Sequence, residues 1–507
     1  MAEFSDRPMA PPPDEEQYYG FFPARYVTEY LESYIDNHVY NETTIRDRIM
    51  FSTRVHDLKK TDDGLWTAFC QGGKQIKAAK VIDAEGMTSI PNWRHFDGEQ
   101  DFQGVIIHHK DFGQSMFLDD PKKQHVAILG GAKSAADVAY AAAKAGKTVS
   151  WIIRENGAGP AALLPAEGRG PYVNSNESFY TRLVASFLPN PFGKQSYLER
   201  FLHRTWIGRC LVKRMWHHVD KDNRRKVNYH RAEGKGMGFE KLEPETSVFW
   251  QNDSSGINQR PDFYSIIATK VHVYRQTINH FTADSVVLSE WKSGRRTHTL
   301  PVDVFVMCTG WSPNSSQFDP WTGFDLGLPT PSPTQSRHGK AAWQALEDIG
   351  DRNILARFPL LRDPPQYQKV ESSVSPFRLY KAMTPIADIQ DHSIVFLGRI
   401  VVGGNFRVAE VQALWAVAYL EGKLKLERQS MELEIGETVA WCRRRYLNKG
   451  DLGSWFFFDV IPYTDMLLDQ LGLRSHRRKG WLKDFFGPCR AADLKDLVEE
   501  YKKIYPT

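Results

Sequence analysis

A glycine-rich turn stands between a short apolar strand and a helix, an arrangement that can cradle phosphate groups. Residues 126–129 form the apolar run, and GGAKSA follows directly at 130–135, ahead of an alanine-rich helical pattern. Gly130 permits the tight turn, and the small Ala132 lets a pyrophosphate approach the main chain. Ala135 lets the helix pack on the strand while its first N–H groups face the phosphates. The spacing therefore predicts a dinucleotide-binding unit.

The residue at the end of the unit's second strand indicates which dinucleotide would bind. NAD sites usually place a carboxylate there, on the ribose, whereas this sequence has Arg154. A guanidinium can hold a 2′-phosphate through paired hydrogen bonds, which favours NADPH. The alternative is a turn kept only for packing, with Arg154 as a surface cation. The methyl group of Ala132 favours this alternative, because it stands where the cofactor would come closest to the backbone.

Periodicity outside this unit places further elements around it. Apolar residues that return after three and four positions predict helices, and short apolar or alternating runs between glycine-containing turns predict strands. The elements are those of an α/β protein. We expect strands within 49–60, 65–71, 75–86, 269–291, 300–311 and 392–400, and helices within 24–37, 178–188, 196–218, 409–423, 463–473 and 493–505.

Composition excludes several classes of protein. The 507 residues carry a net charge of +4, too little for this size to imply a nucleic-acid or membrane-surface partner. No apolar run approaches the ~18 residues of a membrane span, and the first residues lack a secretory signal, so we expect a cytoplasmic protein. Five scattered cysteines without a CxxC pair argue against a disulfide framework and against zinc. The basic run 474–483 is expected to be a solvated loop before a helix.

Two strand ends and one longer pattern point to a second nucleotide site. The stretches 80–92 and 303–314 each end an apolar strand in a glycine-containing turn, and each alone would be explained as a structural turn. FQGVIIHHKDF at 102–112 matches FxGxxxHxxxF, with His108 at the histidine of the pattern. Together these features resemble the class B flavoprotein monooxygenases, which include flavin-containing and Baeyer–Villiger enzymes. The resemblance is strongest to the members from fungal secondary metabolism.

The resemblance extends almost from end to end of the chain. It begins with FSDRPM at 4–9, continues through the patterns above and AEVQALW at 409–415, and ends with YTDMLLDQLGL at 463–473. It implies two doubly wound Rossmann-like domains, one for FAD and one for NADPH, in which NADPH reduces the flavin. It further implies an oxidoreductase that inserts one oxygen atom into a small molecule, a polyketide- or terpenoid-like natural-product intermediate.

The resemblance also assigns residues to the cofactors. His108 would be either catalytic or a hydrogen-bonded strut in the linker between the domains. Glu410 and Gln412, at the start of the helix in 409–423, would lie near the flavin ring, with helix capping as the alternative. The residues expected to face NADPH are Gly130, Ala132, Ser134 and Arg154, and those expected to approach FAD or the joint between the domains are Gly86, Thr309 and Gly310.

The sequence departs from the family at two places that concern one cofactor. The family's first GxGxxG turn, which would hold the FAD pyrophosphate, has no counterpart in these residues, so FAD binding is in doubt. The family's Ala-Thr-Gly turn reads Ala84-Glu85-Gly86, which puts a carboxylate near the path of an anionic cofactor. Both departures fall on the FAD side of the expected fold.

Two hypotheses about function follow from these departures. The first is an FAD- and NADPH-dependent monooxygenase, and the second is a flavin-free descendant that catalyses cyclisation, isomerisation or dehydration. In the second, Glu85 and His108 or His109 would be the acid and the base. A desolvated Glu85 at a buried strand end would be protonated and could act as a general acid. Alternatively, Glu85 points to solvent or caps the following backbone. A scaffold without catalysis is a third possibility.

The domains are expected to interleave along the chain. The FAD-type sheet should lack its usual first strand, and the sequence predicts no oligomeric state. An aromatic insertion either covers a substrate cavity with Trp206, Trp216, Phe249 and Trp250 or buries these rings in the core. The expected segments are 1–120, the first part of the FAD-type domain; 121–300, the NADP-type domain with a helical insertion at 160–265; 301–425, the second part of the FAD-type domain; and 426–507, a helical C-terminal extension.

Overall fold

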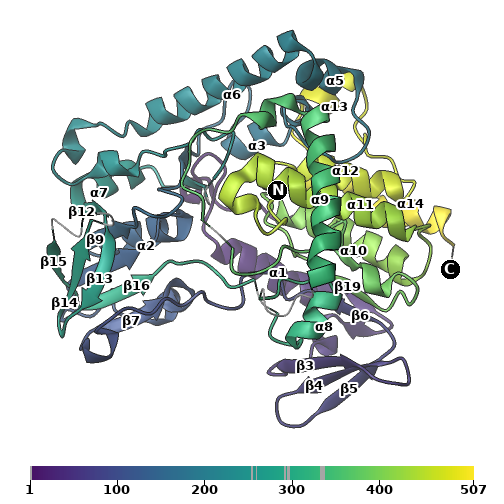
Figure 1. The fold of residues 1–507 in the computed structure, drawn as a ribbon, viewed down its shortest axis with the longest axis horizontal. Helices are drawn as coiled ribbons and strands as arrows, with labels where there is room; N and C mark the ends of the chain where they lie inside the picture. The colour runs from purple at the N-terminus through teal and green to yellow at the C-terminus, as the bar shows by residue number, and fades with distance from the viewer. Residues whose placement is uncertain are drawn as a thin grey trace.

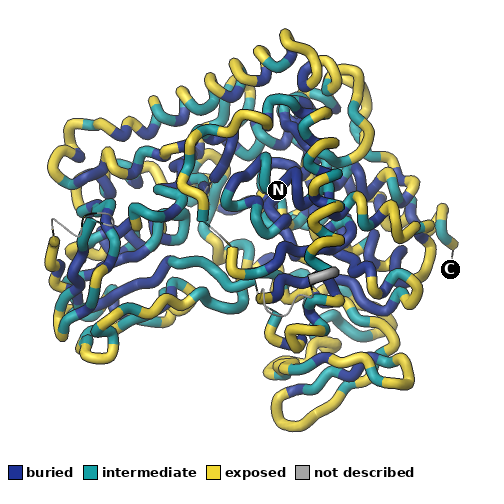
Figure 2. Tube along the Cα trace, viewed as in Figure 1, coloured by how far each residue is buried: buried dark blue, intermediate teal, exposed yellow. Residues whose placement is uncertain are grey.

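The computed structural model has a parallel β-sheet on one side, a helical body on the other, and a long helix along the top (Figure 1). Buried residues fill both sides, and exposed residues lie mainly along the outer helices and loops (Figure 2). No helix in the described part of the chain is long and apolar enough to cross a membrane. The structure describes residues 3–252, 255–258, 260–290, 293, 297–313, 315–331, 337–370 and 372–506.

The main sheet consists of five parallel strands in the order β12-β9-β8-β16-β7. Strand β8 lies at its centre, because its apolar run is buried between two parallel neighbours. This sheet confirms the expected Rossmann-like α/β fold. The strands are β7 (Val105–His108), β8 (His125–Leu129), β9 (Thr148–Ile153), β12 (Val271–Arg275) and β16 (Val304–Met307).

The sheet crosses two of the domain boundaries expected from the sequence. Strand β7 precedes residue 120 and β16 follows residue 300, yet Phe305 of β16 aligns with Ala127 on one side and with Ile106 on the other. The expected assignment of these two strands to the FAD-type domain is therefore wrong. Every residue of β16 is buried. A strand this apolar is stable in the interior of a parallel sheet, because there it pairs with a strand on each side. The rest of the domain division stays a prediction.

Both faces of this sheet are covered. Helix α2 (Lys133–Lys144) packs on one face through small side chains such as Ala135 and Ala139, which bring its backbone close to the strands. Behind it, Tyr140 stacks on Phe263 of α7 (Phe263–Lys270). An antiparallel meander of β13 (Thr277–Phe281), β14 (Ser285–Ser289) and β15 (His298–Pro301) covers the other face.

A second, smaller parallel pair lies near the helical body. Strand β6 (Val81–Asp83) pairs with β19 (Ile394–Phe396), and no other described strand joins this pair. The indole N–H of Trp66 donates to Ser393 Oγ at 3.0 Å and so ties a neighbouring sheet to this pair. That antiparallel sheet contains β3 (Val55–Lys60), β4 (Trp66–Cys70) and β5 (Gln75–Ala78).

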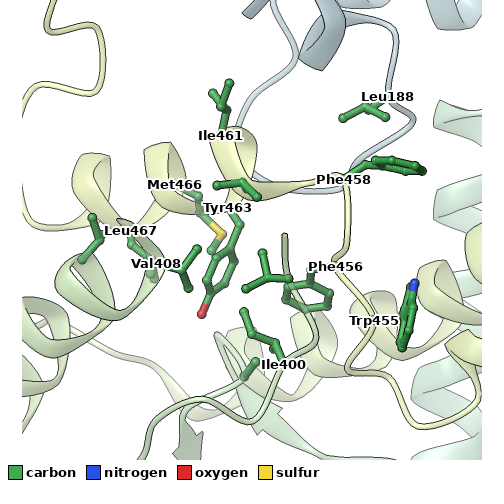
Figure 3. Packing of buried hydrophobic residues seen from close by; sticks show 14 of the residues in the cluster. Leu188, Ile400, Val408, Trp455, Phe456, Phe458, Ile461, Tyr463, Met466 and Leu467 are labelled. Atoms are coloured by element: carbon green, nitrogen blue, oxygen red, sulfur yellow. The ribbon is translucent and has the colours of Figure 1, made fainter. Parts of the chain in front are cut away.

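The largest hydrophobic cluster lies in the helical body, where α10 (Asn405–Leu420), α11 (Arg428–Tyr446) and α12 (Val460–Gln470) meet. Figure 3 shows Tyr463 beside Val408 and Phe456 in this cluster.

Helix α9 (Arg337–Arg357) packs along α11 in backbone contact. Two glycines permit this approach. A Cβ on Gly350 would lie 2.6 Å from Glu437 Cα, and a Cβ on Gly436 would lie 2.7 Å from the carbonyl carbon of Leu346.

The expected insertion forms helices, and α6 is the long one at the top of Figure 1. Trp216, Phe249 and Trp250 are buried in the core cluster, whereas Trp206 is exposed. Three of the four rings therefore belong to the core cluster, and all four also line a cavity of about 490 Å³. The insertion contains α3 (Ser175–Phe179), α4 (Arg182–Ser186), α5 (Tyr197–Arg204) and α6 (Trp206–Val227), flanked by the paired strands β10 (Leu163–Pro165) and β11 (Gly256–Asn258).

The C-terminal segment is helical, as expected. Its basic run is more than a solvated loop, because Arg477 pairs with Glu500 at 2.8 Å and Arg478 with Asp493 at 3.0 Å. All five cysteines are free, and four of them are buried. The remaining elements include α1 (Arg25–Asn37), β1 (Val39–Tyr40), β2 (Thr43–Thr44), α8 (Pro320–Asp325), β17 (Leu379–Tyr380), β18 (Thr384–Pro385), α13 (Trp481–Phe486) and α14 (Leu497–Ile504).

We expect Gly436→Ala to lower the free energy of unfolding by about 1–3 kcal/mol, because the new methyl group would force α11 away from α9. This overlap outweighs the roughly 1 kcal/mol by which alanine favours a helix over glycine. Urea denaturation measures the change. Gly113→Ala is the matched control, since a Cβ there has nothing within 4 Å. Equal stability of the two variants would contradict the backbone contact.

Candidate functional site

Gly130 turns the chain at a point where no larger residue would fit. Its φ is +148°, and a Cβ there would lie 2.4 Å from the carbonyl oxygen of Cys308, directly after β16. Its N–H donates to Ile152 O at 3.0 Å, and its carbonyl accepts from the indole of Trp151 at 2.5 Å. The glycine therefore lets β8, β9 and β16 end side by side at one edge of the sheet.

The first turn of α2 presents backbone donors at this edge. Ala132 is the N-cap residue, with extended backbone, and provides no side-chain cap. Ser134 lies half-buried in the same turn. Uncapped N–H groups at the positive end of a helix dipole suit an anion. The segment 159–161 forms one wall beside them, because Ala161 N–H donates to the Gly131 carbonyl at 2.7 Å.

Arg154 follows β9 at the same edge and lies along Gly157, where a Cβ would be 2.8 Å from its Nε. Burial, and then the nearby cation of Arg94, lower the pKa of the Arg154 guanidinium. Neither arginine forms an ion pair with a residue that the structure describes. Two neighbouring cations without a carboxylate between them form an arrangement that an anion would stabilise.

Two segments, 90–92 and 309–312, join the sheet to the helical side. The Thr309 hydroxyl donates to Asn92 O at 2.6 Å, and Asn92 N–H donates to Gly310 O at 3.0 Å. Pro91 and Trp311 complete the contact as an antiparallel bridge. Thr309 and Gly310 thus connect the end of β16 to the segment that leaves β6. We call this contact the joint.

His108 is fully buried and uses both ring nitrogens in the joint. Its Nε2 donates to Gly310 O at 3.0 Å, and its Nδ1 accepts from Lys110 N–H at 3.2 Å. Burial, and then the neighbouring His109, lower the pKa of the His108 imidazole. His109 itself lies with Nδ1 3.3 Å from Met307 O. Because both nitrogens of His108 are bound to backbone, its geometry favours the strut over a catalytic role.

Glu85 lines a small open cavity and is exposed to solvent, so the hypothesis of a desolvated acid loses its basis. Its side chain is 27% exposed, and its Oε2 lies 3.4 Å from Nη2 of the buried Arg399. The same Nη2 lies 2.8 Å from Asp83 Oδ1, and Nη1 donates to Gly86 O at 2.6 Å. One guanidinium therefore holds the turn after β6 and compensates two carboxylates.

Sequence reasoning missed Arg399, because no periodic pattern marks a buried arginine after a short strand. The signal available was Asp83, a carboxylate at the end of a buried strand that needs a partner. Asp83 also accepts a hydrogen bond from the side-chain amide of Gln317, which lies 2.5 Å from Asp83 Oδ2. The sequence indicates the need for a cation but not which residue supplies it.

Helix α10 begins at Asn405, four residues before its expected start. Glu410 and Gln412 therefore lie inside the helix, and neither caps it. Gln412 is buried, donates to Tyr463 Oη at 2.8 Å and accepts from Gly398 N–H at 3.3 Å. Burial raises the pKa of Glu410, which accepts from Ser5 N–H at 3.1 Å. Gln412 thus fastens the turn after β19 to α12.

A cavity of about 1210 Å³ lies between α2 and the start of α10. Lys133 and Asp137 of α2 line one side, and Gly403 and Gly404 line the other. The four aromatic rings expected to cover a cavity line a different one, of about 490 Å³, beside the insertion helix α6. The apolar walls include Phe21, Phe22, Val27, Phe112, Val138, Tyr140, Tyr180, Phe263 and Phe406. Sequence reasoning missed the segment 20–27, although its paired phenylalanines before a proline were an available signal.

The residues singled out in the sequence fall into two groups. Gly130, Ala132, Ser134 and Arg154 lie at the edge of the main sheet. Glu85 and Gly86 lie at the end of β6, and His108, Thr309 and Gly310 lie in the joint, while Gln412 supports the neighbouring turn through Gly398. The structure thus separates a nucleotide-type turn from a second cluster across the joint.

Comparison with known proteins identifies the family. A family model described as pyridine nucleotide-disulphide oxidoreductase matches residues 26–165. An FAD-dependent monooxygenase from Pyrenophora dematioidea is 32% identical, over 94% of this chain and 88% of the relative. The chain belongs to the FAD-dependent monooxygenase family. The relative named FAD-dependent monooxygenase resA, from Aspergillus sclerotiorum, is 31% identical, over 99% of this chain and 88% of its own.

Solved structures agree with the fold of this monooxygenase. The closed structure of cyclohexanone monooxygenase superposes with a TM-score of 0.54 at 16% identity, over 90% of this chain and 84% of that one. The cyclohexanone monooxygenase of Rhodococcus sp. Phi1, bound to NADP+, gives a TM-score of 0.51 at 16% identity, over 88% and 82%. With the relatives, these likenesses confirm the resemblance to the class B flavoprotein monooxygenases.

We expect His108→Phe to lower stability at neutral pH and to remove part of its pH dependence. Phenylalanine fills the ring's place but cannot make the two buried hydrogen bonds, a loss of about 1–3 kcal/mol. Because the pKa of His108 lies below 6.5, its contribution is complete above the unfolded value of 6.5 and is lost as pH falls toward the folded pKa.

The test is the midpoint of urea denaturation of the wild type and of His108→Phe, measured from roughly pH 8 to pH 5. The difference between wild type and His108→Phe should narrow on acidification. His56→Phe, on an exposed site of β3, is the control and should keep the wild-type profile. A difference independent of pH would contradict the buried neutral imidazole.

Proposed function

We propose that this protein is an FAD- and NADPH-dependent monooxygenase that inserts one oxygen atom into a polyketide- or terpenoid-like intermediate of a secondary-metabolite pathway. The observation that carries the proposal is the cavity of about 1210 Å³ that runs along α2 from Lys133 to Ala145 and reaches the first turn of α10. Both helices begin without a side-chain cap, so two anion-binding helix ends flank one largely apolar chamber. Membership of the monooxygenase family supports oxygen insertion as the reaction.

The residues around Gly130 fit the pyrophosphate of NADPH. The turn leaves the first N–H groups of α2 uncapped, and Ala132 and Ser134 keep the approach narrow but open. Arg154 and Arg94 would hold the 2′-phosphate, since their charges lack carboxylate partners in the described part of the chain. We infer that this edge of the main sheet is the NADPH side of the enzyme.

The residues across the joint fit the flavin end of FAD. Gly86, Gly403 and Gly404 are small, and the first turn of α10 offers N–H groups to an electron-rich ring edge. The buried Nε of Arg399 has no acceptor among the described residues, which leaves a donor for the cofactor. When bound, FAD supplies the redox chemistry that activates dioxygen. Arg399, Gln412 and the joint keep these backbone groups in position.

The cavity walls support an apolar substrate. Aromatic side chains from 20–27, α2 and α10 give the chamber large apolar walls. The hydroxyl of Tyr180 lies beside Gly403, where a Cβ would come within 2.6 Å of it. Burial raises the pKa of Tyr180, so the hydroxyl stays protonated and can orient a substrate oxygen. The size of the chamber suits a polycyclic molecule, and the expected cytoplasmic location stays a prediction.

Arg154→Ala should weaken NADPH binding by about 10- to 100-fold and change NADH binding little, because only NADPH carries a phosphate for the guanidinium. Titration of the purified protein with both dinucleotides measures the two dissociation constants. Arg352→Ala, an exposed arginine of α9, is the matched control and should leave both constants unchanged. Equal losses for NADPH and NADH would refute the assignment of Arg154.

The purified protein should bind FAD with a yellow absorbance band, and NADPH should bleach this band when oxygen is excluded. Glu85→Gln should retain both properties, since glutamine keeps the shape of the side chain and Asp83 still pairs with Arg399. A protein that takes up no FAD, turns over without either cofactor and loses activity in Glu85→Gln would establish the acid–base alternative instead.

A further inference from the structure

The corner between α5 and α6 exposes large apolar side chains that a water-soluble surface would bury. Tyr197 is 90% exposed, Trp206 72% and Ile207 57%. Phe201 and Leu211 are exposed beside them. The corner lies at the top of the molecule in Figure 1, where the long helix α6 meets α5. Single exposed apolar residues are common, but six within the fifteen residues 197–211, Leu198 included, form an interaction surface.

The corner is a rigid element and not a frayed loop. Ser196 and Glu199 form a capping box at the start of α5. Thr205 is the C-cap residue of α5 and also the N-cap residue of α6, where its hydroxyl oxygen accepts a hydrogen bond from Gly208 N–H at 3.0 Å. A Cβ on Gly208 would lie 2.0 Å from Phe201 O, so the two helices touch through their backbones. The sharp turn therefore holds the apolar side chains outward in a fixed geometry.

The same corner concentrates positive charge. Residues 194–214 contain six cations and one acid, Glu199, which is engaged in the capping box, although the whole chain carries a net charge of only +4. None of these six cations forms an ion pair with a residue that the structure describes. The six are Lys194, Arg200, Arg204, Arg209, Lys213 and Arg214. The small net charge of the whole chain argued against a surface partner, but positive charge is in excess at this corner.

The other end of α6 shows that the same helix pairs its cations elsewhere. Arg224 lies 2.9 Å from Asp220, and Arg225 lies 2.7 Å from Asp222. Lys226 lies 2.9 Å from Glu167. At the corner, by contrast, none of the six cations forms an ion pair with a residue that the structure describes. The contrast indicates that their partner lies outside this chain.

We propose that the α5–α6 corner docks on the surface of a lipid bilayer that contains anionic lipids. Tyr and Trp rings with short apolar side chains insert at the level of the headgroups, and flanking Arg and Lys residues bind the anionic phosphates. Like charge on both faces opposes self-association through this surface. This inference concerns a surface away from the cavity between α2 and α10 and does not depend on the proposed function.

Vesicle sedimentation tests the proposal on the full-length protein. Vesicles of phosphatidylcholine alone are compared with vesicles that also contain phosphatidylserine, at low and at high salt. We expect the protein to sediment only with the anionic vesicles and to be released by salt. Arg209→Gln with Lys213→Gln should weaken binding by about 25-fold, roughly fivefold for each charge removed. Trp206→Ser with Ile207→Ser should weaken it by roughly tenfold.

Matched controls change equally exposed residues elsewhere. Trp321→Ser alters a tryptophan of α8 that is 64% exposed, and Lys235→Gln with Lys270→Gln removes two exposed cations near α7. Both should bind vesicles like the wild type. Binding to neither vesicle, or equal losses in corner and control variants, would overturn the proposal. The proposal would also be overturned if the protein dimerised without vesicles and Trp206→Ser with Ile207→Ser abolished the dimer. Binding to soluble polyglutamate without binding to vesicles would overturn it as well.

Discussion

The arrangement of the two sides of this monooxygenase depends on one backbone acceptor, the carbonyl of Gly310. It accepts from the N–H of Asn92 and from Nε2 of His108, each at 3.0 Å. Asn92 lies on the segment that leaves β6, and His108 ends β7, while Gly310 follows β16. Three segments that are distant in sequence therefore meet at one oxygen. Because a buried donor without a partner is costly, none of the three can move without loss.

The width of the chamber between α2 and α10 follows from this junction. Helix α2 is placed by the main sheet, through Gly130 and its contact with Cys308. Helix α10 is placed by the turn after β19, which Gln412 and Arg399 hold. The joint connects the two sets of strands, so the polar groups around it act as supports and the reactive groups would come from bound cofactors. This division explains why the buried His108 is hydrogen-bonded to backbone and why Glu85 pairs with Arg399.

Local patterns made part of the fold predictable and left the rest undetermined. The unit β8, α2 and β9 was predicted because its strand, turn and helix are adjacent in the chain and each has its own periodicity. The place of β16 was not predictable, because a buried apolar strand fits the interior of either sheet. The start of α10 was missed because Gly403 and Gly404 hid the true boundary, and the expected start was set by a motif instead of a cap. Glu85 and Arg399 stand 314 residues apart, so no local signal could reveal their ion pair.

The place of β16 has a consequence for how the protein forms during synthesis. Ribosomes deliver β7, β8 and β9 in order, but the strand that belongs between β7 and β8 is made only at residues 304–307. Until then β7 has no neighbour in the sheet, and β8 has one open edge. Parallel pairing over such a sequence separation is slow and leaves apolar edges open to wrong partners. A synonymous change that slows translation before residue 304 would therefore lengthen the time for which these edges stay open.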